Sequence, residues 1–292
     1  MKEKISIRFF DDREVRAVWN DTDSRWWFSV LDIVGVLNNQ DDYNKNRNYW
    51  KYLKAKLKKD GIQLGSGTTQ LKLLAPDGKR RLSDVIDSDG VITLAKNLPN
   101  TKANRFIEWF LHSEETIDGK SKAKAYALFE SSFFTSIETG TIKGLQQIHS
   151  YLFGGLYDFA GQIRAKNISK GGFKFASAEF LHKTLAEIEK MPEDTLEHVI
   201  DKYTEMNIAH PFMEGNGRTS RIWLDMILKN RFSLCVDWSR INKNDYLEAM
   251  RKSVLDNSRL KELIADALTE LIHDREMYMK GIDYSYYYEE IE

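Results

Sequence analysis

The stretch that decides the fold of the C-terminal part reads His210-Pro211-Phe212-Met213-Glu214-Gly215-Asn216-Gly217-Arg218-Thr219-Ser220-Arg221. Apolar residues recur at helical spacing over residues 195–209, just before it. The residue before a proline is driven out of the α region, so we expect this helix to end near Ala209 and to place His210 at its C-terminal edge. The Gly-Asn-Gly turn then leads into a second helix, which the pattern predicts over Arg218 to Lys229.

These residue types in this order predict a phosphate site. A glycine turn that runs into a helix directs free backbone N–H groups and the positive end of the helix dipole at an anion. Arg218 and Arg221 lie three residues apart on one helix face, so they can bind two phosphates or one bidentately. Glu214 is a carboxylate of the kind that magnesium takes together with phosphate oxygens. His210 is the candidate base for deprotonating an attacking hydroxyl.

At every specified position the stretch resembles the signature of the Fic-domain adenylyltransferases, His-Pro-Phe-x-(Asp/Glu)-Gly-Asn-Gly-Arg-x-x-Arg. The resemblance implies Mg2+-dependent transfer of AMP from ATP to a Tyr, Thr or Ser hydroxyl of a target protein. It makes His210 the catalytic base and Glu214 the magnesium ligand. The implied nucleotide-binding residues are Gly215 and Gly217 for the backbone nest, Asn216 for the α-phosphate, Arg218 for the β-phosphate side and Arg221 for the γ-phosphate. Doc-like relatives that phosphorylate tend to carry a lysine at the second glycine, so an intact Gly217 favours AMP transfer.

The resemblance covers most of residues 123–292. Residues 148–164 are typical of the first core helices of that family, and apolar spacing predicts helices over Ile142 to Phe153 and Leu156 to Arg164. The glycine-containing segment 167–175 fits a two-stranded flap, which Fic proteins use to hold the target segment as an added strand. The candidate flap residues are Gly172, Phe173, Lys174 and Phe175. A plain surface hairpin is the alternative.

The last segment, residues 281–292, holds four tyrosines and an acidic cluster. One class of Fic proteins carries a C-terminal inhibitory motif, Ser/Thr-x-x-x-Glu-(Gly/Asn), whose glutamate faces the second signature arginine. Ser285 and Glu289 match its spacing, although Glu290 replaces the Gly or Asn. The resemblance thus implies a Glu289–Arg221 pair that holds ATP in a pose unsuited to in-line attack. An upstream version near Glu138 fits less well, because the position four residues before it is Phe134. The tail tyrosines Tyr284, Tyr286, Tyr287 and Tyr288 are candidate self-targets, or they pack onto the domain.

The N-terminal part alternates like a small sheet. It predicts strands over Ile5 to Phe10, Val15 to Trp19 and Arg25 to Val30, a short helix over Leu31 to Leu37, a hairpin about Pro76-Asp77-Gly78, and helices over Ser83 to Lys96 and Lys102 to His112. Its dense aromatic residues are interpreted as sheet core rather than a base-stacking platform. The arrangement resembles the Bro-N module of phage antirepressor-type proteins, which implies DNA binding. The basic run Lys45 to Lys59 fits either a phosphate backbone or an ordinary solvated helix face.

Composition sets the outer bounds. The chain has 292 residues, 42% of them hydrophobic, which suits two modest cores. We expect a mainly α protein: a small α+β Bro-N-like domain over residues 1–115, a linker over 116–122, and an all-helical Fic domain with a small β-hairpin flap over 123–292. Residues 1–112 carry a net charge of about +5 and the rest about −6. The lone Cys235 excludes an internal disulfide. No apolar run is long enough to span a membrane, so we expect a cytoplasmic protein. A homodimer is one option for the oligomeric state.

The same residues leave three functions open. The first is an autoinhibited protein adenylyltransferase. The second is a related enzyme on the same fold, which removes AMP from a modified protein or transfers another phosphate-linked group. The third is a DNA-binding regulator whose Fic domain only senses a nucleotide. The intact His210 argues against the third, because binding alone does not need a base at that position.

Overall fold

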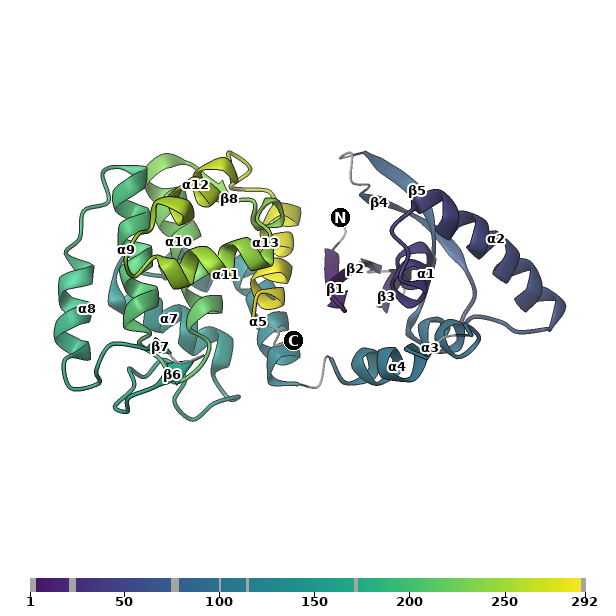
Figure 1. Ribbon diagram of the computed structural model, residues 1–292, viewed down its shortest axis with the longest axis horizontal. Coiled ribbons are helices and arrows are strands. Elements are labelled where there is room, and N and C mark those ends of the chain that lie inside the picture. The colour runs from purple at the N-terminus through teal and green to yellow at the C-terminus, as the bar shows by residue number, and fades with distance from the viewer. Residues whose placement is uncertain are drawn as a thin grey trace. The chain divides into compact units, whose positions relative to one another are not determined.

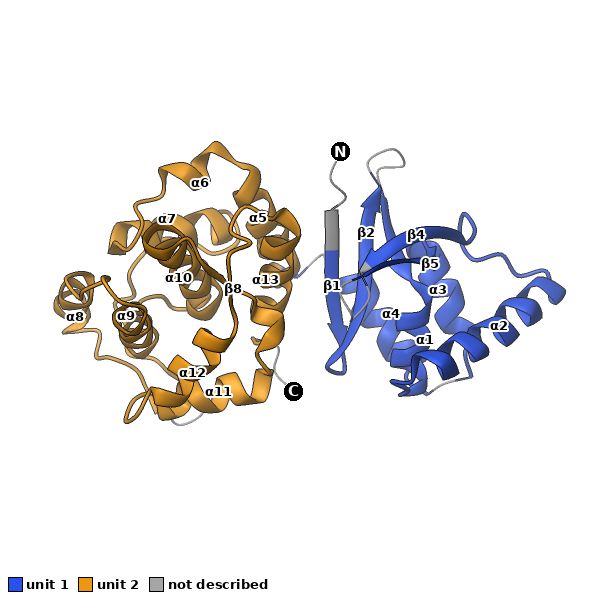
Figure 2. Ribbon diagram, turned by 90° about the horizontal axis from the view of Figure 1, so that it is seen from above, with its two compact units in different colours: residues 1–116 blue, residues 117–292 orange. Residues whose placement is uncertain are grey.

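The computed structural model describes residues 4–20, 25–74, 79–99, 101–113, 116–170 and 173–289, which divide into two compact units, residues 1–116 and 117–292 (Figure 2). The turn expected at Pro76-Asp77-Gly78 falls outside the described residues. Among the described residues, no helix combines the length and the apolar character that a membrane crossing requires. Each unit has its own hydrophobic core.

The first unit is built on a five-stranded antiparallel sheet in the order β1-β2-β3-β5-β4. Buried rings of Phe10, Phe28, Phe106 and Phe110 pack edge to face between the sheet and its helices, so the aromatic residues form core, as interpreted. The strands are β1 Lys4–Phe10, β2 Arg13–Asn20, β3 Arg25–Ser29, β4 Thr69–Leu74 and β5 Arg80–Ile86, and the helices are α1 Val30–Asn38, α2 Tyr43–Lys59, α3 Ser88–Lys96 and α4 Ala103–His112.

One boundary in this unit was predicted wrongly. Residues 83–86 were expected to begin a helix, but they complete strand β5, whose Val85 and Ile86 pair with β3. The helix begins only after Asp87, whose side chain accepts a hydrogen bond from the N–H of Gly90 and caps α3. Residues 83–86 belong to a strand that leads directly into the N-cap Asp87, so the sequence contains no separate boundary between strand and helix before the cap.

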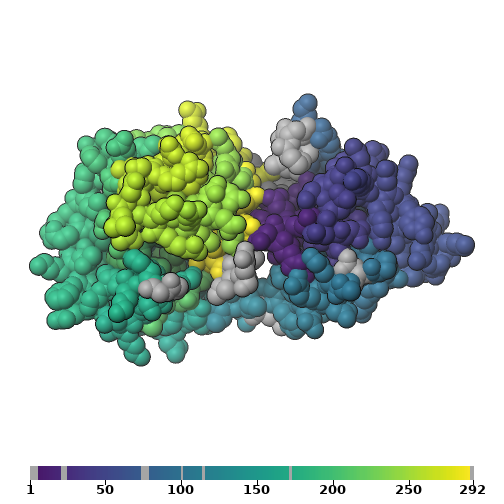
Figure 3. All heavy atoms as spheres, in the orientation of Figure 1, coloured from purple at the N-terminus to yellow at the C-terminus, as the bar shows by residue number. Residues whose placement is uncertain are grey.

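The second unit is a helical bundle around α10, Asn216–Phe232, which packs against α7, α9 and α13 (Figure 1). Side chains of the segment that carries α11 and α12 cover one face of this unit (Figure 3). The other helices are α5 Ile117–Glu130, α6 Ser132–Ser136, α7 Ile142–Phe153, α8 Leu181–Glu189, α9 Leu196–Ala209, the 3-10 turn η1 Trp238–Arg240, α11 Lys243–Lys252, α12 Ser258–Asp266 and α13 Arg275–Tyr287; the short strands are β6 Ser169–Lys170, β7 Phe173–Lys174, β8 Cys235–Val236 and β9 Leu268–Thr269.

Three expectations for this unit need correction. The segment 156–164 forms successive turns rather than a helix, because Gly155 and Gly161 take positive φ values of 76° and 77°. Residues 117–122, expected as linker, are the first turns of α5 and pack within the second unit. The tail, for which no helix was predicted, is largely helical, because Asp274 caps α13 by accepting a bond from the N–H of Met277.

Candidate active site

His210 lies where the proline ends α9, as predicted, in the left-handed region with φ 51° and ψ 65°. Its Nδ1 lies 3.1 Å from the carbonyl oxygen of Asn207, and its ring stacks on Phe175 with centroids 3.7 Å apart. Burial lowers the pKa of His210 to about 4, so the ring is neutral near pH 7. Because a carbonyl only accepts, the proton sits on Nδ1 and Nε2 is the atom that can take a proton.

The glycine turn that follows is closed by the side chain of Asn216. Its Oδ1 accepts from the N–H of Phe212 and its Nδ2 donates to the carbonyl of Phe212, both at 2.8 Å. Gly215 has φ 79°, and a Cβ at this position would overlap the ring of Phe153. Helix α10 therefore starts at Asn216, with its N-terminus facing the loop. The contact of Asn216 with the α-phosphate stays a prediction.

Arg218 is a buried guanidinium held between two carboxylates. Its Nη1 donates to Asp118 of α5 and its Nη2 donates to Oε1 of Glu214 at 3.0 Å. The guanidinium lies over the rings of Phe153 and Tyr286, with centroids 5.2 and 5.4 Å away. Its Nε is buried and has no hydrogen-bond partner among the described residues, and the predicted β-phosphate contact of Arg218 stays a prediction.

Arg221 is bound by the C-terminal helix. Its Nε donates to Oγ of Ser285 at 2.7 Å, and its Nη2 donates to the carbonyl of Ser285 at 2.7 Å and to Oε1 of Glu289 at 2.6 Å. Burial would raise the pKa of Glu289, but the charge and hydrogen bond of Arg221, together with the charges of Lys170 and Arg218, lower that pKa to about 2. A Cβ at Gly217 would overlap Oε1 of Glu289, so this carboxylate lies directly against the glycine turn.

Aromatic side chains enclose the Arg221 guanidinium. The rings of Tyr246, Tyr288 and Trp238 lie 5.5 to 6.0 Å from its central carbon. The hydroxyl of Tyr288 donates to the carbonyls of Trp238 and Ile241, and that of Tyr286 donates to Ser121. Both hydroxyls are therefore buried and engaged in this conformation, whereas self-targeting requires an accessible hydroxyl.

The carboxylate predicted to bind magnesium is accessible. The side chain of Glu214 is 52% exposed, and its Oε1 also accepts from the N–H of Gly215 at 3.0 Å. The described residues contain no group of three or more His, Cys, Asp or Glu side chains that could bind a metal by themselves. One accessible carboxylate beside an anion site nevertheless fits magnesium, which takes few protein ligands when phosphate oxygens supply the rest.

The hairpin expected in segment 167–175 is present as the antiparallel pair of β6 and β7, in which Ser169 pairs with Lys174 and Lys170 with Phe173. Its role as a target flap stays a prediction. Gly172 lies outside the described residues. Phe173 packs edge to face on Phe175, and Phe175 in turn stacks on His210. The hairpin thus borders the candidate base directly.

Two residues that shape this loop were not predicted as site residues. His149 of α7 is fully buried, accepts from the N–H of Gly161 at 2.8 Å through Nδ1, and holds the carbonyl of Glu214 at 2.9 Å through Nε2. Burial lowers its pKa to about 4, so it is a neutral structural clamp on the loop. Arg164 donates to backbone carbonyls on both sides of His210. Neither residue stands out locally, because their bonds to the backbone of this loop and its flanking turn reach across 65 positions to Glu214 and 46 positions to His210.

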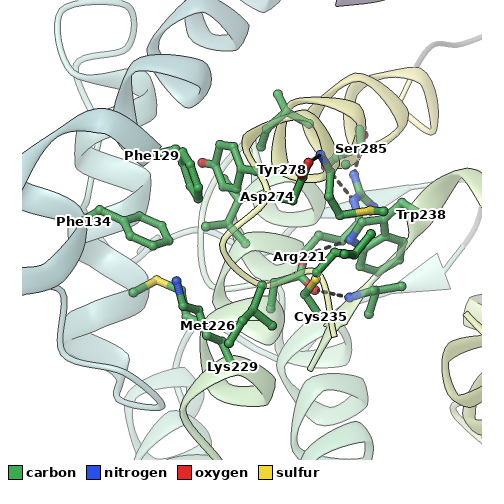
Figure 4. A pocket seen from close by; sticks show the side chains of 18 residues that line it. Phe129, Phe134, Arg221, Met226, Lys229, Cys235, Trp238, Asp274, Tyr278 and Ser285 are labelled. Carbon is green, nitrogen blue, oxygen red and sulfur yellow. Dashed lines mark hydrogen bonds between the residues drawn. The ribbon is translucent and has the colours of Figure 1, made fainter. Parts of the chain in front are cut away.

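A cavity of about 50 Å³ lies behind Arg221, between α10 and α13. Figure 4 shows Phe129 and Phe134 at one side of it and Trp238 and Ser285 at the other, with Arg221 between. The cavity is mostly apolar, which identifies it as a packing gap behind the C-terminal helix rather than a nucleotide pocket.

Two protein-family models match this chain. Residues 140–228 match the Fic/DOC family, and residues 14–116 match the BRO family N-terminal domain. The chain therefore carries a Fic domain that contains the loop described above, preceded by a Bro-N domain. These two matches confirm both resemblances noted in the sequence.

Relatives of known description are protein adenylyltransferases by name. The chain is 31% identical over 145 residues to the protein adenylyltransferase VbhT of Bartonella schoenbuchensis, a match of 45% of this chain and 30% of that protein. It is 25% identical over 151 residues to the probable protein adenylyltransferase Fic of Salmonella typhimurium, a match of 46% of this chain and 75% of that protein. A crystal structure of BepC from Bartonella tribocorum with bound AMPPNP overlaps 53% of this chain and 85% of that chain, at 20% identity and a TM-score of 0.46. The chain thus spans less than a third of VbhT.

Proposed function

We propose that this protein transfers AMP from ATP to a Tyr, Thr or Ser hydroxyl of a target protein. In this reaction the target oxygen bonds to the α-phosphorus, the bond from that phosphorus to the β-bridging oxygen breaks, and pyrophosphate leaves. His210 takes the hydroxyl proton on Nε2, which its bond to Asn207 leaves as the acceptor. The order of base, helix N-terminus and two guanidinium groups on one loop supports this assignment.

The observation that carries the proposal is an anion already present at the loop. The Glu289 carboxylate lies against Gly217 and bonds Arg221 at 2.6 Å, and its pKa of about 2 reflects how strongly this position favours negative charge. A nucleotide phosphate is an anion of the kind the loop would accept in its place. We therefore propose that Glu289 inhibits the enzyme by competing with ATP for Arg221, and that displacement of α13 activates it.

Magnesium and the target segment complete the proposal. Glu214 would hold Mg2+, which supplies positive charge to the phosphates when it is bound. Arg218 Nε provides a donor for the phosphates. The flap would align the target segment through backbone pairing with β6–β7, beside His210.

The test uses wild type, Glu289→Gly and Glu289→Gly/His210→Ala with magnesium and either α-labelled or γ-labelled ATP. We expect protein labelling from the α-phosphate, a rise in Glu289→Gly, and loss of labelling in the double variant. Labelling from the γ-phosphate would instead indicate a kinase-like transfer. If no variant is labelled but each releases AMP from a modified protein, removal of AMP is the activity.

A second proposal concerns the first unit, which we infer binds DNA through α2. The observation that favours it is that α2 buries Trp50, Leu53 and Leu57 on one stripe and exposes its lysines on the rest of its surface. Binding of a labelled duplex should weaken with salt, because lysine–phosphate contacts release counterions. Lys51→Gln/Lys58→Gln should reduce the affinity and the salt slope, whereas the same change at exposed lysines outside α2, Lys183 of α8 and Lys190 just after it, should not.

A further inference from the structure

Arg164 connects the turn that carries His210 to the flap. Its Nε donates to the carbonyl of His210 at 2.7 Å, and its Nη2 donates to the carbonyls of Ala209 at 3.0 Å and Ala176 at 2.6 Å. Its Nη1 donates to the carbonyl of Lys166 at 2.7 Å, and its backbone N–H donates to the carbonyl of Pro211 at 2.9 Å. Arg164 is only 3% exposed, so these bonds are shielded from water.

This set of bonds is specific to a guanidinium. A planar group with five N–H donors can hold several carbonyls in fixed directions, whereas an ammonium donates from a single point. None of these partners is a carboxylate, so Arg164 acts on the course of the backbone and not as half of an ion pair. Nε and Nη2 hold the carbonyls of His210 and Ala209 at the left-handed turn. Nη2 also holds the carbonyl of Ala176, next to the ring of Phe175 that stacks on the imidazole.

We propose that Arg164 is a positioning residue, which fixes the position of the base His210 relative to the flap. This inference rests on the proposed AMP transfer, because it assigns the flap and His210 to that reaction. The bonds of the Arg164 side chain go to the backbone of Lys166, Ala176, Ala209 and His210. Since these positions flank the base and the flap, we expect Arg164 to act on the transfer step and on the target rather than on nucleotide affinity.

The experiment compares Arg164→Lys with its parent in the Glu289→Gly background. We expect ATP affinity within about two-fold of the parent, which also reports the folded fraction, and a transfer rate at saturating ATP lowered ten-fold or more. As a matched control, Lys202→Met removes another buried cation, which bonds the carbonyl of Glu189 and the carboxylate of Glu193. It should lower thermal stability but leave the transfer rate per folded molecule unchanged.

A readout that does not need activity separates this inference from the proposed function. The NMR titration midpoint of His210 should rise in Arg164→Lys, because a released turn exposes the imidazole, and should not change in Lys202→Met. Phe175→Leu should also raise the titration midpoint of His210. In the double variant Arg164→Lys/Phe175→Leu, the midpoint should be no higher than in Arg164→Lys alone. An unchanged midpoint in Arg164→Lys, or additive shifts, would overturn the positioning role even if every variant transferred AMP.

A separate set of contacts concerns helix α5, which lies beside α13 (Figure 1). Asp283 of α13 is fully buried, pairs with Nζ of Lys122 at 2.6 Å, and accepts from the hydroxyl of Tyr126. The hydroxyl of Tyr286 donates to Ser121 at 3.0 Å. Helix α13 is therefore anchored to α5 by buried polar groups.

The same helix also reaches the nucleotide loop. Asp118, in the first turn of α5, pairs with Nη1 of Arg218, while Glu289 pairs with Arg221. Each signature arginine thus faces a carboxylate from α5 or from the C-terminal end of α13. A tetra-anionic nucleotide that approached the loop would meet both carboxylates.

We infer that α5 and α13 form one latch, with Asp118 as a second inhibitory carboxylate. This second inference rests on the proposed inhibition by Glu289, whereas the first rests on the proposed AMP transfer. Asp118 is 59% exposed, so it can swing away more easily than Glu289, whose side chain is 19% exposed. The phosphates of the nucleotide would displace Asp118 first. Displacement of α13 would then require that the buried ion pair of Lys122 with Asp283 breaks.

Two measurements test the latch. Asp118→Asn should tighten ATP binding about five-fold, as expected for loss of one partly exposed competing charge. Asp283→Asn should increase hydrogen exchange of the α13 amides ten-fold or more and raise α-label incorporation, whereas Glu138→Gln, in an exposed pair with Lys143, should change neither. Unchanged ATP affinity in Asp118→Asn, or unchanged α13 exchange in Asp283→Asn, would overturn the latch. The exchange result stands whether or not AMP transfer is the activity.

Discussion

Replacing Glu289 by glutamine tests how strongly its charge holds the site closed. Glutamine keeps the size of the side chain but removes the charge that faces Arg221 at 2.6 Å. Burial opposes ionisation of Glu289, yet Arg221, together with Lys170 and Arg218, lowers its pKa from 4.5 to about 2. One pKa unit corresponds to about 1.4 kcal/mol, so a pKa lowered from 4.5 to about 2 means that the charge stabilises the closed contact by about 3 to 4 kcal/mol. The opening equilibrium should therefore shift by about 300-fold.

The assay is the initial rate of α-label incorporation at fixed ATP and magnesium. We expect the rate of Glu289→Gln to rise by up to about 300-fold, provided that opening of α13 limits the wild-type rate. Glu193→Gln is the matched control, because Glu193 is also a carboxylate bound by two cations, Lys202 and Arg231, away from the loop. Its labelling rate should equal that of wild type.

Two results would refute this reasoning. A rate for Glu289→Gln within two-fold of wild type, while Glu289→Gly rises strongly, would show that the side chain blocks by its size and not by its charge. Equal rates in all three proteins would show that the contact does not inhibit at all. Hydrogen exchange of α13 in each variant would confirm that the helix had been released before the rate was interpreted.

The remaining predictions concern four further groups. Gly281→Ala should stabilise α13 by about 1 kcal/mol and lower basal labelling about five-fold, because a Cβ there meets only Trp238 at 3.4 Å; differential scanning calorimetry should show a higher Tm. Since the pKa of Glu289 is lowered in the folded state, its contribution to stability is present above pH 4.5 and is lost as the pH falls toward 2, which Trp238 fluorescence should follow. In Glu289→Gly the transfer rate should stay level down to about pH 5 and fall below about pH 4, where His210 protonates; an acid limb near pH 6.5 would contradict the buried, neutral ring. Burial raises the pKa of Cys235 to about 12, so maleimide should react with it far more slowly in the folded protein than in urea.

Local sequence was sufficient for the elements whose signals are contained in a few residues. Periodicity and the His210–Pro211 boundary predicted the end of α9 correctly, and α7 runs over Ile142–Phe153 as expected. The expected helix over 156–164 failed because apolar spacing does not register the positive φ of Gly155 and Gly161. The linker expected from polar composition at 117–122 is helical because its polar side chains face α10 and α13.

The sequence by itself determined which chemical groups the loop carries, because His210, Glu214, Arg218 and Arg221 stand within twelve residues, and their types predict an anion site. The tertiary structure decided what each of them faces. Asp118 reaches Arg218 across 100 positions and Glu289 reaches Arg221 across 68. Such pairs depend on how α5, α10 and α13 pack, and packing is set by the whole core rather than by the spacing of residues along the chain.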